Sequence, residues 1–222
     1  MGRRRTLEEQ KKTVDWAQNL EIPQLPPPSL KFKDIQSLYL SELKEYFALA
    51  ALSRSKTAPS SLVLGAWELV FSVRVKLERA LLKSIDERVS LDPSAIENLF
   101  SGNMFGASKK QGVSLRFALT SCQPTKLCGA ACYAHDVLDA TPAAVIRGAI
   151  NSWIATSYEI GSLSEDYLDS AMGPHYTRAI AAAIDEAPLA SSDWQRRPYI
   201  RLAHVGELSE YPAFANYLGR KI

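Results

Sequence analysis

Apolar residues recur at helical spacing through the first hundred residues of the chain. In residues 34–54 they stand three or four positions apart, and a second run of this kind extends over about residues 62–88. Such spacing places the apolar side chains on one face of an α-helix. A shorter polar helix is expected near the N-terminus, where Thr6 is followed three residues later by Glu9, the pattern of a capping box. The first half of the chain is therefore predicted to be helical.

Two segments after residue 110 have the alternating pattern of β-strands. In residues 113–120, VSLRFALT, every second position holds a larger apolar side chain, and residues 199–205 are also expected to form a strand. Helical segments separate these two strands, an order that is typical of βαβ units with a parallel sheet. The sequence thus predicts an α/β fold, in which a helical N-terminal region precedes a partial parallel βαβ domain or an incomplete barrel.

The helices of the second half have clear start signals. Thr141 and Pro142 stand where an N-cap and a first helical residue are expected. Another helix is predicted over residues 165–187, with an interruption near Gly173 and Pro174, and a short one ends the chain. Together these patterns suggest three parts: a polar helix and proline-rich linker at 1–29, a helical region at 30–110, and an α/β metal-binding domain at 111–222.

Composition and charge are those of an ordinary globular protein. The 222 residues are 46% hydrophobic, which is enough for a sizeable core. The formal net charge of +2 is too small to indicate a nucleic-acid or membrane partner by itself. Basic residues do cluster at the N-terminus, in Arg3, Arg4 and Arg5. This cluster is either a solvated tail or a nucleic-acid contact.

No membrane association is expected. The most apolar stretch, residues 62–75, contains Glu68 and Arg74, whereas a bilayer span needs about 20 apolar residues without such charges. We therefore expect a buried helix there. The N-terminus lacks the apolar region of a signal peptide, and the three cysteines cannot all pair within the chain. Reduced thiols and a cytoplasmic location are the resulting expectations.

The three cysteines lie close together in the sequence. Cys122, Cys128 and Cys132 have the spacing Cys-x5-Cys-x3-Cys, directly after a predicted strand and before a predicted helix. Thiolates are soft ligands that select zinc, copper(I) or iron–sulfur clusters. Three of them leave one iron of a [4Fe–4S] cluster without a protein ligand, open to a substrate or cofactor. A three-cysteine [4Fe–4S] site is therefore the first interpretation.

Two other interpretations of this loop stay open. With His135 as a fourth ligand, the spacing becomes Cys-x5-Cys-x3-Cys-x2-His, which suits a structural zinc ion. The protein would then be a non-enzymatic, zinc-stabilised module that binds a protein or nucleic-acid partner. Alternatively, the cysteines are unrelated core residues, since cysteine is among the most often buried residue types.

The loop also resembles that of a known class of enzymes. Cys132 and Tyr133 begin a Cys-Tyr-Ala sequence, which resembles the cluster loop of radical S-adenosylmethionine enzymes and the loop of a phage protein family called gene product 88. The usual spacing in the radical enzymes is Cys-x3-Cys-x2-Cys, from which this chain departs. The resemblance implies a [4Fe–4S] cluster with Tyr133 beside it, and cleavage of S-adenosylmethionine to a radical that abstracts hydrogen from a substrate.

A second segment supports the same resemblance. AHVGELSEYP, at the end of the second predicted strand, is similar to the Gly-Gly-Glu stretch of these enzymes, with Val205 in place of the first glycine. The resemblance implies that Gly206 and Glu207 contact the amino group of S-adenosylmethionine. Barrels of that class have six or more strands, and only two are predicted here. The chain is therefore expected to be truncated, catalytically inactive, or completed by a partner chain.

A few polar residues outside the loop are further candidates. His204 lies on the second predicted strand, where it would share a cavity with Glu207, while His175 is expected at the surface. Arg116 and Arg201 are expected on the strands. There each arginine either faces water, pairs with a carboxylate, or grips a carboxylate or phosphate ligand.

Overall fold

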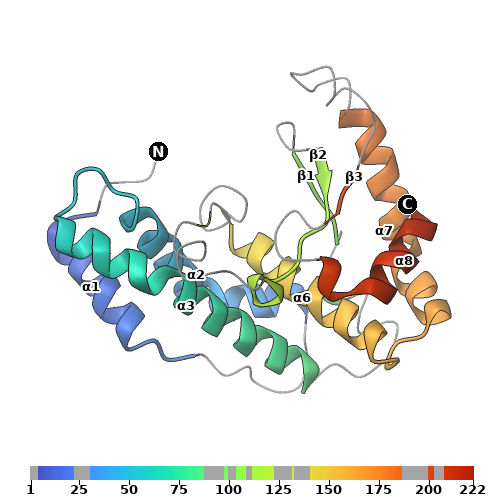
Figure 1. Ribbon diagram of the computed structural model, residues 1–222, viewed down its shortest axis with the longest axis horizontal. Helices are drawn as coiled ribbons and strands as arrows, with labels where there is room; N and C mark the ends of the chain where they lie inside the picture. The colour runs from blue at the N-terminus through green and yellow to red at the C-terminus, as the bar shows by residue number, and fades with distance from the viewer. Residues whose placement is uncertain are drawn as a thin grey trace.

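The structure is a computed structural model that describes residues 5–22, 31–87, 98–99, 104–108, 112–122, 132, 141–186, 200–202 and 208–222. The proline-rich linker lies outside these residues. Six helices account for most of the described part: α1 (Leu7–Gln18), α2 (Phe32–Leu52), α3 (Ser60–Asp86), α6 (Pro142–Glu159), α7 (Glu165–Glu186) and α8 (Pro212–Lys221). In Figure 1, α1, α2 and α3 lie at one end of the molecule, α7 and α8 lie at the other, and α6 crosses between them.

The three N-terminal helices form where the sequence predicts them. The capping box of α1 is confirmed: the Thr6 hydroxyl accepts a hydrogen bond from the Glu9 amide, and the Glu9 carboxylate accepts one from the Thr6 amide. Helices α2 and α3 begin and end within about two residues of their predicted limits. All three pack against one another. Their apolar faces contribute Val14, Leu43 and Leu77, among others, to a single connected core.

Helix α3 carries an ion pair within this core. Arg74 Nε lies 2.6 Å from Glu78 Oε1, and the two side chains are 1% and 0% exposed. The Arg74 guanidinium also lies over the ring of Tyr46 on α2, 5.4 Å from its centroid. The second oxygen, Glu78 Oε2, accepts a hydrogen bond from the backbone amide of Thr120 at 3.1 Å. The pair therefore connects α3 both to α2 and to a segment far along the chain.

Helix α6 is the central helix of the fold. It begins as predicted, with Thr141 as N-cap and Pro142 in the first turn. It packs against α2, α3 and α8. Twelve of its residues are buried, so it is enclosed on nearly all sides. Gly148 permits a close approach to the 115–118 segment, since a Cβ at this position would lie 3.0 Å from Phe117 O.

The predicted α/β domain is wrong. The strands of the described part are β1 (Gly106–Ser108), β2 (Gly112–Ser114) and β3 (Ile200–Arg201), each only two or three residues long. β1 pairs with β2 antiparallel, and β2 pairs with β3 in parallel over two residue pairs. This small mixed sheet lies against α7 (Figure 1). Neither a parallel βαβ domain nor an incomplete barrel occurs in the described residues.

The strand predicted over residues 113–120 ends after Ser114, for an identifiable reason. Positions from both alternating sets are buried: Ser114 and Ala118 are as inaccessible as Leu115 and Phe117, while Arg116 and Thr120 are partly exposed. The segment then continues without regular structure into a single 3-10 turn, η1 (Leu119–Ser121). The alternating pattern of this segment therefore comes from larger and smaller side chains in an enclosed position. It does not mark one buried and one solvated face of a sheet.

Helices α7 and α8 are joined through a chain of hydrogen bonds. The Tyr176 hydroxyl donates to the Tyr217 hydroxyl, which donates to Asp169, each at 3.0 Å. Lys221 Nζ also donates to Asp169, at 2.6 Å. Burial raises the pKa of both tyrosines, so both hydroxyls keep the protons that this chain requires.

Two predictions about α7 are wrong. The helix is not interrupted near Gly173, but continues through Pro174 to Glu186. His175 is not a surface residue: it is 3% exposed. Its Nδ1 lies 3.2 Å from Arg178 Nη2, and because arginine only donates, this nitrogen accepts. The local sequence of α7 gives no sign that the imidazole ring of His175 is buried.

Among the described helices, none combines the length and the apolar character needed to cross a bilayer. For α3 this agrees with the charged residues inside its apolar stretch. Arg74 and Glu78 are held there by each other and by protein partners.

We predict that Glu78→Gln destabilises the protein by about 3–5 kcal/mol, because it removes the carboxylate charge that lies beside the buried Arg74. The free energy of unfolding in urea, followed by far-UV circular dichroism, measures this loss. The matched control is Glu87→Gln, which removes an exposed ion pair with Lys83 at the same i,i+4 spacing. Its effect should stay below about 0.5 kcal/mol. Equal effects of the two substitutions would contradict a special role for the buried pair.

We also predict that His175 makes stability depend on pH. Burial, with a smaller contribution from the charge of Arg178, lowers the pKa of His175 from 6.5 to about 4. Between these pH values the unfolded chain binds a proton that the folded chain does not. The free energy of unfolding should therefore fall as the pH falls from about 6.5 towards 4, by at most about 1.4 kcal/mol per pH unit.

The measurement is a series of urea unfolding curves across this pH range, for the wild type and for His175→Asn. The wild-type curve contains the titration of other groups as well, so the informative quantity is the difference between the two proteins. A steeper loss in the wild type is expected. Parallel curves would show that His175 titrates alike in both states.

Candidate functional site

Cys122 follows directly on the η1 turn, which the core holds in place. The Thr120 amide donates to Glu78, and the Ser121 hydroxyl donates to Ala118 O at 2.7 Å. The Cys122 amide closes the turn by donating to Leu119 O at 3.0 Å. The thiol itself is partly exposed. The first cysteine thus stands at the edge of the core, on a backbone anchored to α3.

Helix α6 anchors the segment that leads to this turn. Asn151 Nδ2 donates to Arg116 O at 2.8 Å and to Met104 O at 3.1 Å. The Ser152 hydroxyl accepts from the Ala118 amide at 2.8 Å. Asn151 and Ser152 are both fully buried. These side chains supply hydrogen bonds that a neighbouring strand would otherwise provide.

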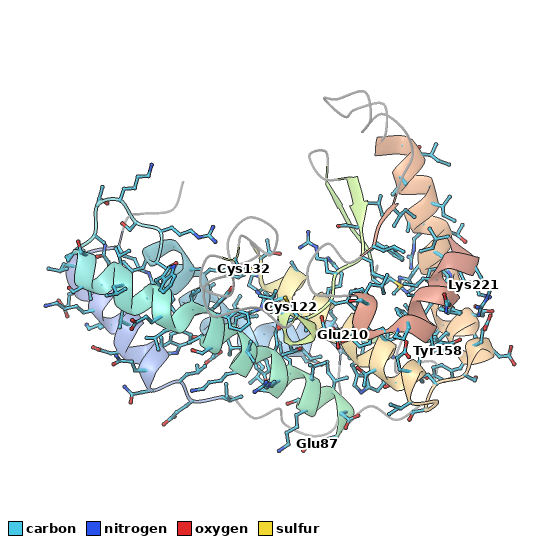
Figure 2. The ribbon with its side chains drawn as sticks, in the orientation of Figure 1. Glu87, Cys122, Cys132, Tyr158, Glu210 and Lys221 are labelled. Carbon is cyan, nitrogen blue, oxygen red and sulfur yellow. The ribbon has the colours of Figure 1, made fainter. Side chains whose placement is uncertain are left out.

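Cys132 is held at the other end of the loop. Arg54, which follows the last turn of α2, donates from Nη2 to Cys132 O at 2.5 Å. The Cys132 side chain is partly exposed, like that of Cys122. In Figure 2 both labelled cysteines appear in the middle of the molecule. The chain is therefore attached to the helical core both beside Cys122 and at Cys132.

The described cysteines have the character of candidate ligands. Within the described residues, neither Cys122 nor Cys132 forms a disulfide bond, and neither is a buried core residue. The described part contains no convergent group of three His, Cys, Asp or Glu side chains. The other residues expected at the site lie outside the described part, so their positions stay predictions; they are Cys128, Tyr133, His135, His204, Gly206 and Glu207.

Arginines occur on the segments around this loop, and two of them were missed from the sequence. Arg54 touches Cys132 and was not a candidate. Arg147, on α6, was also missed. A visible signal for it is a single charged residue in an otherwise largely apolar helix, AAVIRGAINSWIA. Burial lowers the pKa of Arg147, and the nearby charge of Arg116 lowers it further. Positive charge of this kind suits an anionic centre or ligand.

The basic N-terminus is partly neutralised. Arg5 makes a two-pronged contact with Glu45 on α2, at 2.7 and 2.8 Å, and also donates to Thr13. The hydrogen bond to Glu45 raises the pKa of Arg5, and that bond also lowers the pKa of the carboxyl. Arg3 and Arg4 lie outside the described residues. Arg5 is thus committed to holding α1 against α2.

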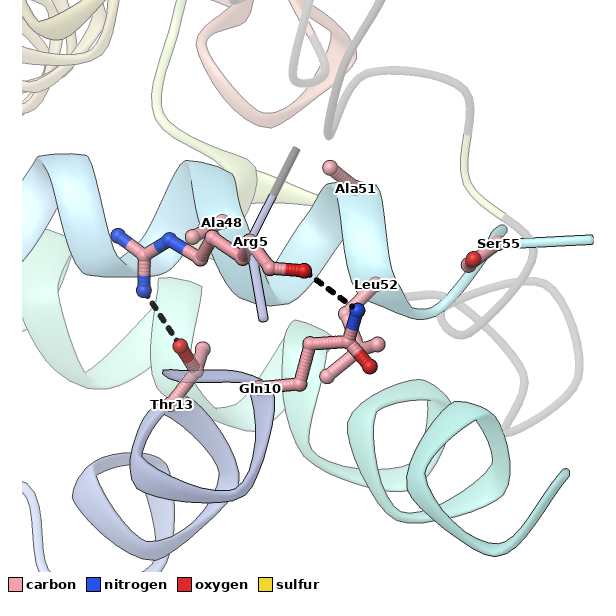
Figure 3. Close-up of a pocket in the computed structure, with 7 residues that line it drawn as sticks. All are labelled: Arg5, Gln10, Thr13, Ala48, Ala51, Leu52 and Ser55. Carbon is pink, nitrogen blue, oxygen red and sulfur yellow. Dashed lines mark hydrogen bonds between the residues drawn. The ribbon is translucent and has the colours of Figure 1, made fainter. Parts of the chain in front are cut away.

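A cavity of about 300 Å³ lies beside this contact (Figure 3). Its wall includes Arg5, Gln10 and Thr13 on one side and the last turn of α2 on the other. Gln10 Nε2 donates to Arg5 O at 3.1 Å, as the figure shows. The cavity also reaches Ser55, the residue after Arg54. None of the described residues that line it is a His, Cys, Asp or Glu.

Comparison with known proteins gives no relative for this chain: no family model, no curated protein and no solved structure matches it.

Proposed function

We propose that this protein binds a [4Fe–4S] cluster through Cys122, Cys128 and Cys132. The observation that carries the proposal is the state of the two described cysteines. Both residues are partly exposed, and the backbone is attached to the core at Cys132 and just before Cys122. Incidental cysteines are usually buried in a core, where they act as small apolar residues.

The anchoring of the loop fits the needs of a metal site. Ligands must be held close to their binding geometry by groups around them. The Glu78 contact restrains the backbone before Cys122, and Arg54 restrains the backbone at Cys132. Both contacts are made to backbone atoms, so they position the chain at the two cysteines without using the side chains as ligands for the anchoring groups.

Local charge also favours the proposal. Thiolates and a bound cluster bring negative charge, which hydrogen bonds and nearby cations offset. Arg54 donates to the backbone carbonyl of Cys132 and so brings a positive charge to this end of the predicted loop. When bound, the cluster would supply one-electron chemistry, while the protein would hold it and control access to it.

The finer parts of the proposal rest on the sequence resemblance. They are S-adenosylmethionine as the ligand of the open iron, contacts from Gly206 and Glu207, and radical chemistry in the cytoplasm. A partner chain that completes the active site belongs to the same proposal. The alternative, a zinc-stabilised module that binds nucleic acid through its N-terminus, is weakened because Arg5 is paired with Glu45.

We predict that the protein, purified without oxygen, contains about four irons and about four acid-labile sulfides per chain and has a broad visible absorbance. Iron, sulfide and zinc analysis beside the spectrum checks this. Cys122→Ser and Cys132→Ser should each lose most of the iron, because a hydroxyl is a poorer ligand than a thiolate. Ser72→Ala, an exposed hydroxyl change on α3, is the control and should keep it.

The metal found decides between the interpretations. One zinc per chain and no colour would overturn the cluster and bring His135 into the ligand set. Retention of iron in both serine variants would show that the metal is bound elsewhere. If the cluster is present, titration with S-adenosylmethionine in the wild type and in Glu207→Gln tests the finer proposal. Equal affinity in the two proteins would remove Glu207 from it.

A further inference from the structure

The packing of α6 on residues 116–118 brings two arginines together. Gly148 lies against Phe117, at a distance that leaves no room for a side chain between helix and segment. One turn further along α6, Asn151 binds Arg116 O. Arg147 precedes Gly148, and Arg116 precedes Phe117. The two arginines therefore flank the same close contact, one from each side.

Arg147 is placed unusually for an arginine. It is only partly exposed, and its Nε atom is fully buried without a hydrogen-bond partner in the described part of the chain. An unsatisfied buried donor on a charged group is costly, typically more so than for a neutral group. The lowered pKa of Arg147 agrees with this environment, in which burial and the charge of Arg116 both act against the charged form.

Arg116 reaches the same region from the segment after β2. Its guanidinium lies along Gly106 in β1: Nε, Cζ and Nη2 are 3.6–3.8 Å from the position that a Cβ of Gly106 would occupy. The orientation of Arg116 is thus supported by β1 on one side and by the Asn151 contact to its own carbonyl on the other.

We propose that Arg116 and Arg147 together bind a small oxyanion, the phosphate or carboxylate group of a small molecule. The positive charge of Arg116 acts on Arg147, and partial burial strengthens such an interaction. Among the described residues Arg147 has no carboxylate partner, so a bound anion would supply its counter-charge. The planar fork of arginine matches the oxygens of phosphate and carboxylate in pairs, which makes arginine the usual residue for such groups.

This site does not depend on the proposed cluster. Its residues come from β1, the 115–118 segment and α6, and no cysteine contributes to it. It is therefore testable in protein that contains no metal, such as the Cys122→Ser variant. Failure of the anion site would leave the metal proposal intact, and failure of the metal proposal would leave the anion site intact.

The test measures binding of inorganic phosphate and, in a separate arm, of malonate, by calorimetry and by the thermal unfolding midpoint. Sodium chloride at matched ionic strength serves as the reference. We expect one of the two anions to bind with a stoichiometry of one and to raise the midpoint above the chloride reference. Arg147→Gln and Arg116→Gln should each weaken this binding by at least about tenfold, the loss expected for one charge-assisted contact.

Arg79→Gln is the matched control, because Arg79 is an exposed arginine on α3. It should bind like the wild type. Phosphate binding alone would identify a phosphate group as the natural ligand, and malonate binding alone a carboxylate. The proposal is overturned if neither anion binds beyond the chloride reference. It is also overturned if binding persists unchanged in both Arg147→Gln and Arg116→Gln, or is lost equally in Arg79→Gln.

Discussion

The buried ion pair between Arg74 and Glu78 is the interaction on which the rest of the arrangement depends. Two charges in a core are stable only when they are paired and supported by further contacts. Here the ring of Tyr46 covers the guanidinium, and the amide of Thr120 donates to the second carboxylate oxygen. Displacement of α2 or of the η1 turn would remove one of these supporting contacts. The pair thus specifies where the segment that carries Cys122 meets the helical core.

Helix α6 complements this pair from the opposite direction. A helix enclosed on nearly all sides is usually apolar throughout, yet α6 has Asn151 and Ser152 at its centre. Both side chains bind backbone groups of the neighbouring segment, at Arg116 and Ala118. These bonds replace part of a β-ladder, because they satisfy buried peptide groups that would otherwise need a strand. Asn151 and Ser152 on α6 therefore provide hydrogen bonds that the short sheet does not.

The same arrangement explains which parts of the candidate site were predictable. The cysteines were visible, because three thiols in one loop are a chemical pattern that requires no knowledge of the fold. Arg147 could be noticed as a charged residue in an apolar helix, but its relation to Arg116 could not, because Arg116 is distant in sequence. Arg54 was missed for the same reason, since it acts on a residue 78 positions away.

By itself, the sequence determined the helices of the first half, the capping box at Thr6 and the start of α6 at Thr141, because helix hydrogen bonds and caps join residues three or four positions apart. Only the tertiary structure decided that residues 113–120 do not form one long strand and that His175 is buried. A strand needs partners from elsewhere in the chain, and alternation of large and small residues fits an enclosed segment as well as a sheet. Burial likewise depends on what packs against a residue, and for His175 on α7 that information lies outside the local sequence.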